Sequence, residues 1–372
     1  MESWSRRAVL LGFAGVAGGL TAGCVSKDPL VQGPRRPAPS PSPTPEPEPD
    51  PVWPLLGMPL GDRADAMHAA VAVKVPDNKN EHPQVGINDA DIVFVQLDGY
   101  VDSTGQSSTR LMPVYHSRFP EGVGPVRSIR PVDIPLLAPM HAVIASTGAA
   151  PWVEKYALMF PDFVDGSATY MKTKGTGSFS IDPSRVRVYQ GQKKFDRAVV
   201  AHPAVLSGRS ERFADGPPVP YFPYAASADD VSTANGESAK TVVAPWKRGG
   251  QYAMSYEFDD SEGLYLRNMP WGKHILADGS RVTTDNVLLI MAKQSFGKLI
   301  SGSGGQEPIH EIENGSGKFI YANGGRYVTG KWEKGAIEDV FNFTLDDGSP
   351  LLMAPGRTFV ELLNTDAEAE VS

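Results

Sequence analysis

Two arginines and an aspartate lie close together in residues 124–133, Gly-Pro-Val-Arg-Ser-Ile-Arg-Pro-Val-Asp. The planar guanidinium groups of Arg127 and Arg130 can each bind a carboxylate or a phosphate through two hydrogen bonds. The proline after Arg130 suits the first turn of a helix, whose free N–H groups also attract anions. The segment therefore predicts an anion site at Arg127, Ser128 and Arg130, oriented by Asp133. The alternative is that a buried carboxylate such as Asp133 pairs with these arginines to fix the turn.

Polar residues also follow several apolar runs of strand length. His116, with Asp91 or Asp98, could act as an acid/base pair, although the spacing does not single these residues out. In α/β sheets the carboxyl ends of parallel strands line the ligand crevice. The strand-end residues are therefore expected to face one cavity together with the two arginines, and they are Asp77, Asn78, Asp98, His116, Ser146 and Thr147.

Common catalytic motifs do not occur in the sequence. No Gly-Lys pair is followed by Ser or Thr as in a phosphate-binding loop, and neither Gly-x-Ser-x-Gly nor His-Glu-x-x-His is present. Residues 295–298 match Ser-x-x-Lys, but they follow an apolar run and lack the companion motifs. The seven histidines are scattered. The sequence thus predicts neither a metal nor a cofactor.

Residues 124–130 resemble the most specific motif of the YerB-type bacterial lipoproteins, a family of unknown function with two consecutive domains. The resemblance covers roughly residues 68–363 and implies this architecture, but it brings no established activity. Further matching positions are 73–74, 78, 84–86, 90–93, 109–110, 258–259, 265–267, 274, 286–287, 315–318, 330–332 and 347–348.

Residues 1–23 are typical of an export signal. Arg6 and Arg7 precede an uncharged run that is short for a membrane span and ends in small residues. The arginine pair resembles a twin-arginine signal, with general secretion as the alternative route. Cys24, the only cysteine, follows directly and resembles a lipoprotein processing site. We expect a two-chain lipid on Cys24 that anchors the protein to the outer face of the cytoplasmic membrane; an uncleaved anchor or a secreted form is the alternative.

Residues 24–55 form the expected linker between the lipid and the folded part. Nine prolines alternate with Ala, Ser, Thr, Glu and Asp from Pro34 to Pro51, which favours an extended polyproline II spacer. At about 3.1 Å per residue, this spacer would reach on the order of 55 Å from the membrane. A recognition segment for a proline-binding domain is the alternative.

The net charge argues against a nucleic-acid partner. The chain of 372 residues carries a formal charge of −8, and removal of residues 1–23, whose Glu2, Arg6 and Arg7 sum to +1, gives −9. Nucleic-acid surfaces are usually basic. The expected partners are therefore the membrane, through Cys24, and a cell-wall component or an envelope protein.

The sequence predicts an α+β fold of two domains. Residues 56–210 alternate buried strand-like runs with helical segments and are expected to form a mixed α/β domain. Residues 211–240 have the composition of an inter-domain connection. Residues 241–365 repeat turn signals between β-branched runs, which predicts an antiparallel β-rich domain. The expected strands are 71–75, 91–97, 111–116, 142–146, 287–292, 318–321, 327–332, 341–345, 351–353 and 358–363, and the expected helices are 132–140 and 152–160.

These observations favour a lipid-anchored extracytoplasmic protein that binds a cell-envelope ligand, an anionic glycan or a peptide group, or a protein partner, without catalysis. A hydrolase that uses His116 and a nearby carboxylate is the main alternative, and an assembly scaffold is a third. A deep cavity at His116 would favour the hydrolase, and an exposed apolar patch the scaffold. The predicted binding residues are Arg127, Arg130, Ser128, Asp133 and Asn78.

Overall fold

The computed structural model describes residues 50–101, 107–246, 252–299 and 306–372. The predicted export signal, the lipidation site Cys24 and nearly all of the proline-rich linker lie outside these ranges. From Pro49 onward the chain forms one compact unit. In the described ranges, no helix combines the length and the apolar character needed to cross a membrane.

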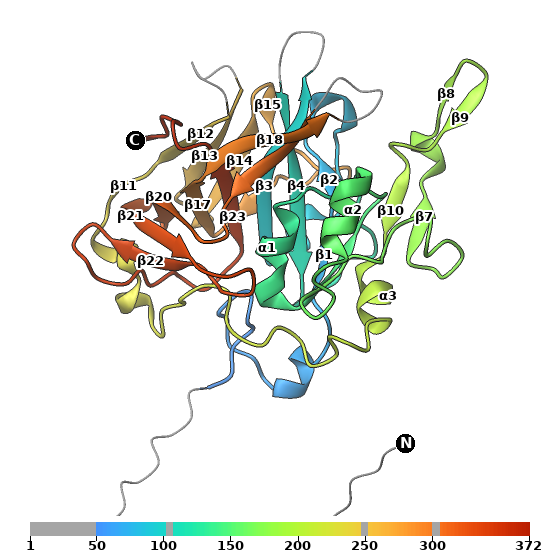
Figure 1. The fold of residues 1–372 in the computed structure, drawn as a ribbon. Coiled ribbons are helices and arrows are strands. Elements are labelled where there is room, and N and C mark those ends of the chain that lie inside the picture. The colour runs from blue at the N-terminus through green and yellow to red at the C-terminus, as the bar shows by residue number, and fades with distance from the viewer. Residues whose placement is uncertain (1–49, 102–106, 247–251, 300–305) are drawn as a thin grey trace, which may run out of the picture. The chain divides into compact units, whose positions relative to one another are not determined.

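A twelve-stranded sheet runs through this unit (Figure 1). Strands of both halves of the chain meet in it, because β23 pairs in parallel with β3 on one side and with β17 on the other. Both β17 and β23 are buried along their whole length, as expected for aliphatic central strands covered on both faces. The strand order is β11 (Glu237–Ser238), β21 (Arg326–Lys334), β20 (Gly315–Asn323), β17 (Asn286–Met291), β23 (Thr358–Leu363), β3 (Ile92–Val101), β4 (Ser107–Tyr115), β1 (Val71–Val73), β5 (Ala142–Ala145) and β6 (Val164–Asp165), with β2 (Val75–Pro76) beside β4 and β22 (Asn342–Leu345) beside β21.

A second sheet has six strands, and three hairpins or strand pairs stand apart. In β12 and β14 buried residues alternate with more exposed ones, so one face of this sheet packs on the core. Its strands are β15 (Gly272–Lys273), β14 (Leu264–Met269), β13 (Ala253–Asp259), β12 (Thr241–Pro245), β24 (Glu370–Val371) and β16 (Thr283–Thr284). The separate pairs are β18 (Lys293–Leu299) with β19 (Gln306–Glu311), β8 (Arg187–Tyr189) with β9 (Gln192–Lys194), and β7 (Phe179–Ile181) with β10 (Val199–Ala201).

The α-helices described are short and begin near prolines. α1 (Asp133–Leu137) is fully buried, and a 3-10 turn (Ala138–Met140) continues it. α2 (Pro151–Ala157) and α3 (Pro203–Gly208) have proline in their first turn, where no backbone N–H is needed. In Figure 1, α1 and α2 lie in front of the strands of the first half. Further 3-10 turns span Arg63–Ala66, Lys79–Glu81, Ile87–Asp89, Pro183–Arg185, Ala228–Asp230 and Ser232–Asn235.

The β-rich character predicted from the sequence is confirmed, with two corrections. The second half is not wholly antiparallel, because β17 and β23 run parallel to each other. Residues 351–353 form no strand; among the described residues Met353 makes an isolated bridge to Tyr224. The large sheet also crosses the predicted boundary between residues 56–210 and 241–365.

Candidate functional site

The structure does not bring the candidate catalytic residues together. β3 and β4 are antiparallel, with Leu97 opposite Thr109. The carboxyl end of one strand therefore lies beside the amino end of the other, which puts Asp98 at one end of the pair and Asp91 and His116 at the other. The prediction that the strand-end residues lie together fails for His116, because β4 runs antiparallel to β3. It does not fail for the parallel strands β1 and β5: the backbone of Arg127 joins their ends, with its N–H donating to the oxygen of Lys74 and its oxygen accepting from the N–H of Thr147.

His116 does not form an acid/base pair with Asp91. Its backbone N–H, not its ring, donates to Oδ2 of Asp91 at 2.7 Å. The ring Nε2 lies 3.0 Å from the carbonyl oxygen of Ala66 and donates to it. The imidazole packs against His68 and Trp53, with centroid distances of 4.6 and 5.3 Å. Asp91 therefore caps the end of a strand, and this geometry gives no support to the hydrolase.

Burial, together with the neighbouring ring of His68, lowers the pKa of His116 to about 4. An unfolded histidine titrates near 6.5. Between these values the unfolded chain binds the proton first, so stability is fully present above pH ~6.5 and is lost as the pH falls toward 4. We expect the wild type to lose about 3 kcal/mol more unfolding free energy from pH 7 to pH 4 than His116→Leu, measured by urea denaturation.

The comparison with His116→Leu isolates the contribution of His116 to the pH dependence of stability. Burial raises the pKa of neighbouring Asp91 to about 6, which favours the folded state at low pH in both proteins and cancels in the difference. An identical pH dependence in the two proteins would contradict the buried, neutral state of His116.

Arg130 is buried, and residues of the chain itself engage its guanidinium. Only 2% of its side chain is exposed. Nη2 donates to the backbone oxygen of Asp98 at 2.8 Å and to its Oδ1 at 2.9 Å. Nε lies 3.1 Å from Oε2 of Glu307 on β19. Arg130 thus joins the start of α1 to strands β3 and β19, and an outside anion would have to displace two buried carboxylates.

Asp133 holds the backbone of Arg130 rather than its guanidinium. Its Oδ2 accepts the N–H of Arg130 at 2.7 Å. Its Oδ1 accepts from Nζ of Lys74 at 2.8 Å and from Nε2 of Gln96 at 2.6 Å. Burial lowers the pKa of Lys74 to about 8, although Asp133 opposes this shift. These bonds fix the start of α1 on β3 and on Lys74, the residue that directly follows β1.

Arg127 and Asn78 converge on one carboxylate, that of Glu81. Arg127 pairs with Oε1, and the amide of Asn78 donates to Oε2. Arg127 keeps 15% of its side chain exposed, and burial lowers its pKa to about 10. Ser128 accepts a bond from Arg110 through its backbone oxygen at 2.8 Å. The predicted binding residues therefore form two internal networks, one around Glu81 and one around Asp98 and Asp133.

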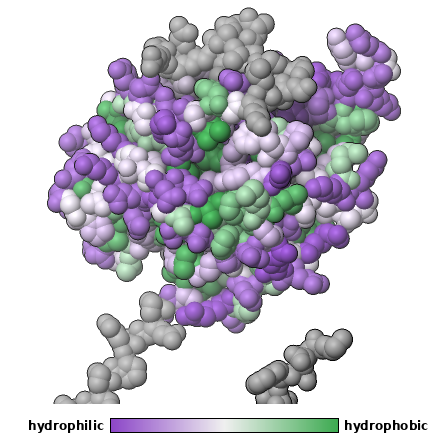
Figure 2. Space-filling model, viewed as in Figure 1, coloured by the Kyte–Doolittle hydropathy of each residue, from purple (hydrophilic) through white to green (hydrophobic). Residues whose placement is uncertain are grey.

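A groove of about 360 Å³ lies directly beside the second network, between α1, α2 and β19. Figure 2 shows hydrophobic residues gathered over α1 and α2 on this face. We call it the α1–α2–β19 groove. Its lining residues are Pro131, Val132, Pro135, Trp152, Tyr156, Ile309, His310, Glu311, Ile312 and Glu313.

The Arg130 ion pair builds this groove from two distant parts of the chain. Pro131 and Val132 follow Arg130 directly, and Ile309 follows its partner Glu307 by two residues on β19. Trp152 of α2 also reaches the β18–β19 hairpin, because a Cβ on Gly297 would come within 2.8 Å of its ring. The motif recognised in the sequence therefore positions the groove, which sequence reasoning missed because its two walls are far apart in the chain.

The groove combines apolar walls with polar groups that remain available. The indole N–H of Trp152 is buried without a hydrogen-bond partner in the described part of the chain. Burial, with a smaller contribution from Glu313, raises the pKa of Tyr156 to about 12, so its hydroxyl stays a donor. Glu311 and Glu313 are exposed at the groove, and Glu311 already pairs with Lys293, whose Nζ lies 2.9 Å from its Oε2. A pocket of aromatic, aliphatic and acidic groups suits an apolar ligand that carries positive charge.

Asp77, His82 and His274 are the described residues whose potential metal-ligand atoms lie within 4.8 Å of one another. The guanidinium of Arg267 already contacts two of these three residues: Nη2 lies 2.8 Å from Oδ2 of Asp77, and Nη1 lies 2.9 Å from Nδ1 of His274. A bound cation would lie beside this positive guanidinium. We therefore propose no metal here, and the absence of a metal stays a prediction.

The fold and the motif residues define a known family. Residues 55–202 match "Protein of unknown function (DUF3048) N-terminal domain", and residues 242–360 match the C-terminal domain of the same family. The chain belongs to this family.

Two comparisons with *Bacillus subtilis* proteins agree. The chain is similar to "Putative lipoprotein YerB" of strain 168, with 34% identity over 101 residues, which span 27% of each protein. The crystal structure of the YerB protein has a TM-score of 0.65 at 20% identity and covers 86% of this chain and 98% of that one. The resemblance to the YerB-type family is thus confirmed, and the second match shows a shared fold.

Proposed function

We propose that this chain is an exported, lipid-anchored protein that binds an extended, positively charged peptide segment of a cell-envelope partner in the α1–α2–β19 groove, without catalysis. The lipid anchor is supported by Cys24 after a signal-like segment and by the name of the *Bacillus* relative. The groove itself carries the binding proposal, because it joins an exposed apolar surface to a buried, unpartnered indole N–H at Trp152.

An extended peptide fits because the groove follows the edge of β19. Residues 309–313 contribute to the lining one after another. Alternate side chains of a strand point to opposite faces, so consecutive lining residues indicate that the ligand lies along the edge. Among the described strands β19 forms a ladder only with β18. Its other side lies against β3, where the backbone N–H of Leu97 donates to Nε2 of His310 and Gly99 lies close to Pro308. An extended peptide would therefore lie along residues 309–313 and place alternate side chains in the groove.

The charges favour a cationic peptide over an anionic glycan at this site. Glu311 and Glu313 stand at the groove, whereas Arg127 and Arg130 are held by internal carboxylates. Lysine side chains of a bound peptide could pair with Glu313, and with Glu311 in competition with Lys293, while its apolar side chains pack on Ile309 and Tyr156. Complementary charge of this kind mainly determines which partner is accepted.

The test uses two synthetic heptapeptides, Val-Lys-Val-Lys-Val-Lys-Val and its counterpart with glutamate for lysine, titrated into the full-length chain by isothermal titration calorimetry. We expect saturable binding of the lysine peptide, at least about tenfold tighter than that of the glutamate peptide. Binding of neither peptide, or equal binding of both, would contradict the proposal.

A charged side chain in the groove locates the site. Ile309→Lys replaces a partly exposed groove residue and should abolish binding of the lysine peptide. Ile275→Lys is the matched control, because Ile275 is 37% exposed and lies outside the groove, and it should bind like the wild type. Equal affinities of the two variants would rule out the groove as the site.

A further inference from the structure

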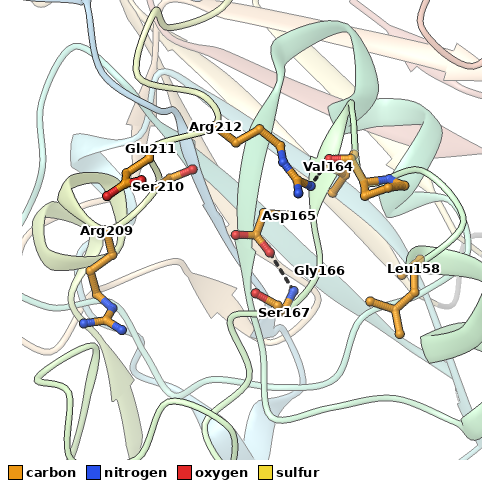
Figure 3. Close-up of a pocket in the computed structure, with 11 residues that line it drawn as sticks. Leu158, Val164, Asp165, Gly166, Ser167, Arg209, Ser210, Glu211 and Arg212 are labelled. Atoms are coloured by element: carbon orange, nitrogen blue, oxygen red, sulfur yellow. Dashed lines mark hydrogen bonds between the residues drawn. The ribbon is translucent and has the colours of Figure 1, made fainter.

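A second cavity lies beside α2, at the edge of the twelve-stranded sheet (Figure 3). It has a volume of about 340 Å³ and is enclosed by the end of α2, by β6 with its following turn, and by residues 209–212 after α3. β6 runs parallel to β5, so Asp165 and Ser167 stand at the carboxyl end of a parallel edge strand. Ligands of α/β sheets usually bind at such ends, and the cavity has the size of a small-molecule site.

A buried hydroxyl in this cavity lacks a partner. Ser210 is 8% exposed, and its Oγ makes no hydrogen bond within the described part of the chain. Leaving a buried donor unsatisfied costs about 1–3 kcal/mol. Asp165 lines the same cavity from β6 (Figure 3), and its Oδ1 accepts the N–H of Ser167 at 2.9 Å. Both groups keep hydrogen-bonding capacity for a molecule in the cavity.

The cavity also holds charges of both signs that do not neutralise one another. Arg209 and Arg212 line it from one segment, with Glu211 between them in the sequence, and Asp165 lines it from β6; the Arg209 side chain is directed away from Asp165 (Figure 3). Arg212 donates to the backbone oxygen of Pro161, and neither arginine forms an ion pair with a carboxylate of the described residues. Unpaired charges of both signs around one small cavity complement a ligand that carries both.

We propose that this cavity binds a zwitterionic α-amino acid with a small aliphatic side chain. The carboxylate of the ligand is held by Arg212, whose guanidinium can bind it through two hydrogen bonds. The ammonium group donates to Asp165 and to the oxygen of Ser210. Leu158 and Val164 provide the apolar contact for the side chain.

Alanine, as each enantiomer separately, is the probe for isothermal titration calorimetry with the full-length chain. Propionate has the same carboxylate without the ammonium group, and ethylammonium has the ammonium without the carboxylate. We expect at least one enantiomer to bind at least about tenfold more tightly than either fragment. Propionate binding as tightly as alanine would reduce the cavity to a simple anion site and overturn the proposal, as would no binding of alanine up to about 10 mM.

Substitutions assign the binding to this cavity. Asp165→Asn keeps an acceptor for the Ser167 N–H but removes the charge, and Ser210→Ala removes a hydroxyl without a protein partner, so both variants should melt within about 2 °C of the wild type. We expect alanine to bind about tenfold more weakly to Asp165→Asn and more weakly also to Ser210→Ala. Asp229→Asn, an exposed aspartate outside the cavity, should leave the affinity unchanged. Wild-type affinity in Asp165→Asn would overturn the proposal.

Discussion

Replacement of Arg130 by alanine should lower the free energy of unfolding by about 3–5 kcal/mol. The substitution removes the cation that lies 2.9 Å from Oδ1 of Asp98 and 3.1 Å from Oε2 of Glu307. Both carboxylates are nearly inaccessible to water, so solvation cannot replace the lost interaction; Asp98 keeps its ion pair with Arg110, and Glu307 loses the cation nearest to it. Urea denaturation of the full-length chain, followed by circular dichroism, measures the loss.

An exposed arginine provides the control. Arg118 also pairs with a carboxylate, that of Asp89 at 3.1 Å, but 77% of its side chain is exposed. Surface ion pairs of this kind contribute little, so Arg118→Ala should change stability by less than about 1 kcal/mol. If Arg130→Ala lowers the free energy of unfolding no more than Arg118→Ala does, Arg130 is not held by internal ion pairs as we describe. Its predicted role in binding an external anion would then have to be considered again.

The strands and helices of the first half were predictable from local pattern. Apolar runs of β-branched residues gave the cores of β1, β3, β4 and β5, and prolines marked the starts of α1 and α2. The observed strand ends differ from the predicted ones by a few residues, because hydrogen bonding to neighbouring strands extends a strand beyond its apolar centre. Strand β3, for example, continues to Val101, where it still pairs with β4.

Local pattern does not indicate strand direction, and the predicted placement of His116 beside Asp98 failed for that reason. The same alternation of apolar residues suits parallel and antiparallel pairing, so nothing local placed Asp98 and His116 at opposite ends. The parallel pairing of β23 with β3 was equally hidden, because it joins strands that are separated by most of the chain.

The sequence indicated only part of the role of the Arg130 segment. Its arginines and aspartate did mark an ionic centre, and the alternative of internal pairing was open from the start. The partners of Arg130, however, include Glu307, which no spacing rule connects with residue 130. The groove beside this pair was missed for the same reason, since Trp152 and Ile309 come from distant segments.

Replacement of Arg267 by methionine should also destabilise the protein by about 3–5 kcal/mol. Arg267 is fully buried, and its Nη2 lies 2.8 Å from Oδ2 of Asp77 and 3.7 Å from Oε1 of Glu361. Burial alone would raise the pKa of Asp77, but Arg267 and His82 outweigh it and hold this pKa below its usual range. Without the arginine, Asp77 would be a buried charge with little compensation. Urea denaturation again measures the effect.

A double-mutant cycle tests whether loss of the Arg267–Asp77 ion pair causes this destabilisation. Asp77→Asn in the Arg267→Met background removes the uncompensated charge, so the double variant should recover about 2 kcal/mol relative to Arg267→Met alone. Asp77 belongs to the first family region and Arg267 to the second, so this coupling measures what one ion pair adds to the β23–β3 pairing that already joins the two regions. If Asp77→Asn instead lowers the free energy of unfolding further, the destabilisation by Arg267→Met comes from lost packing and not from the unpaired carboxylate of Asp77.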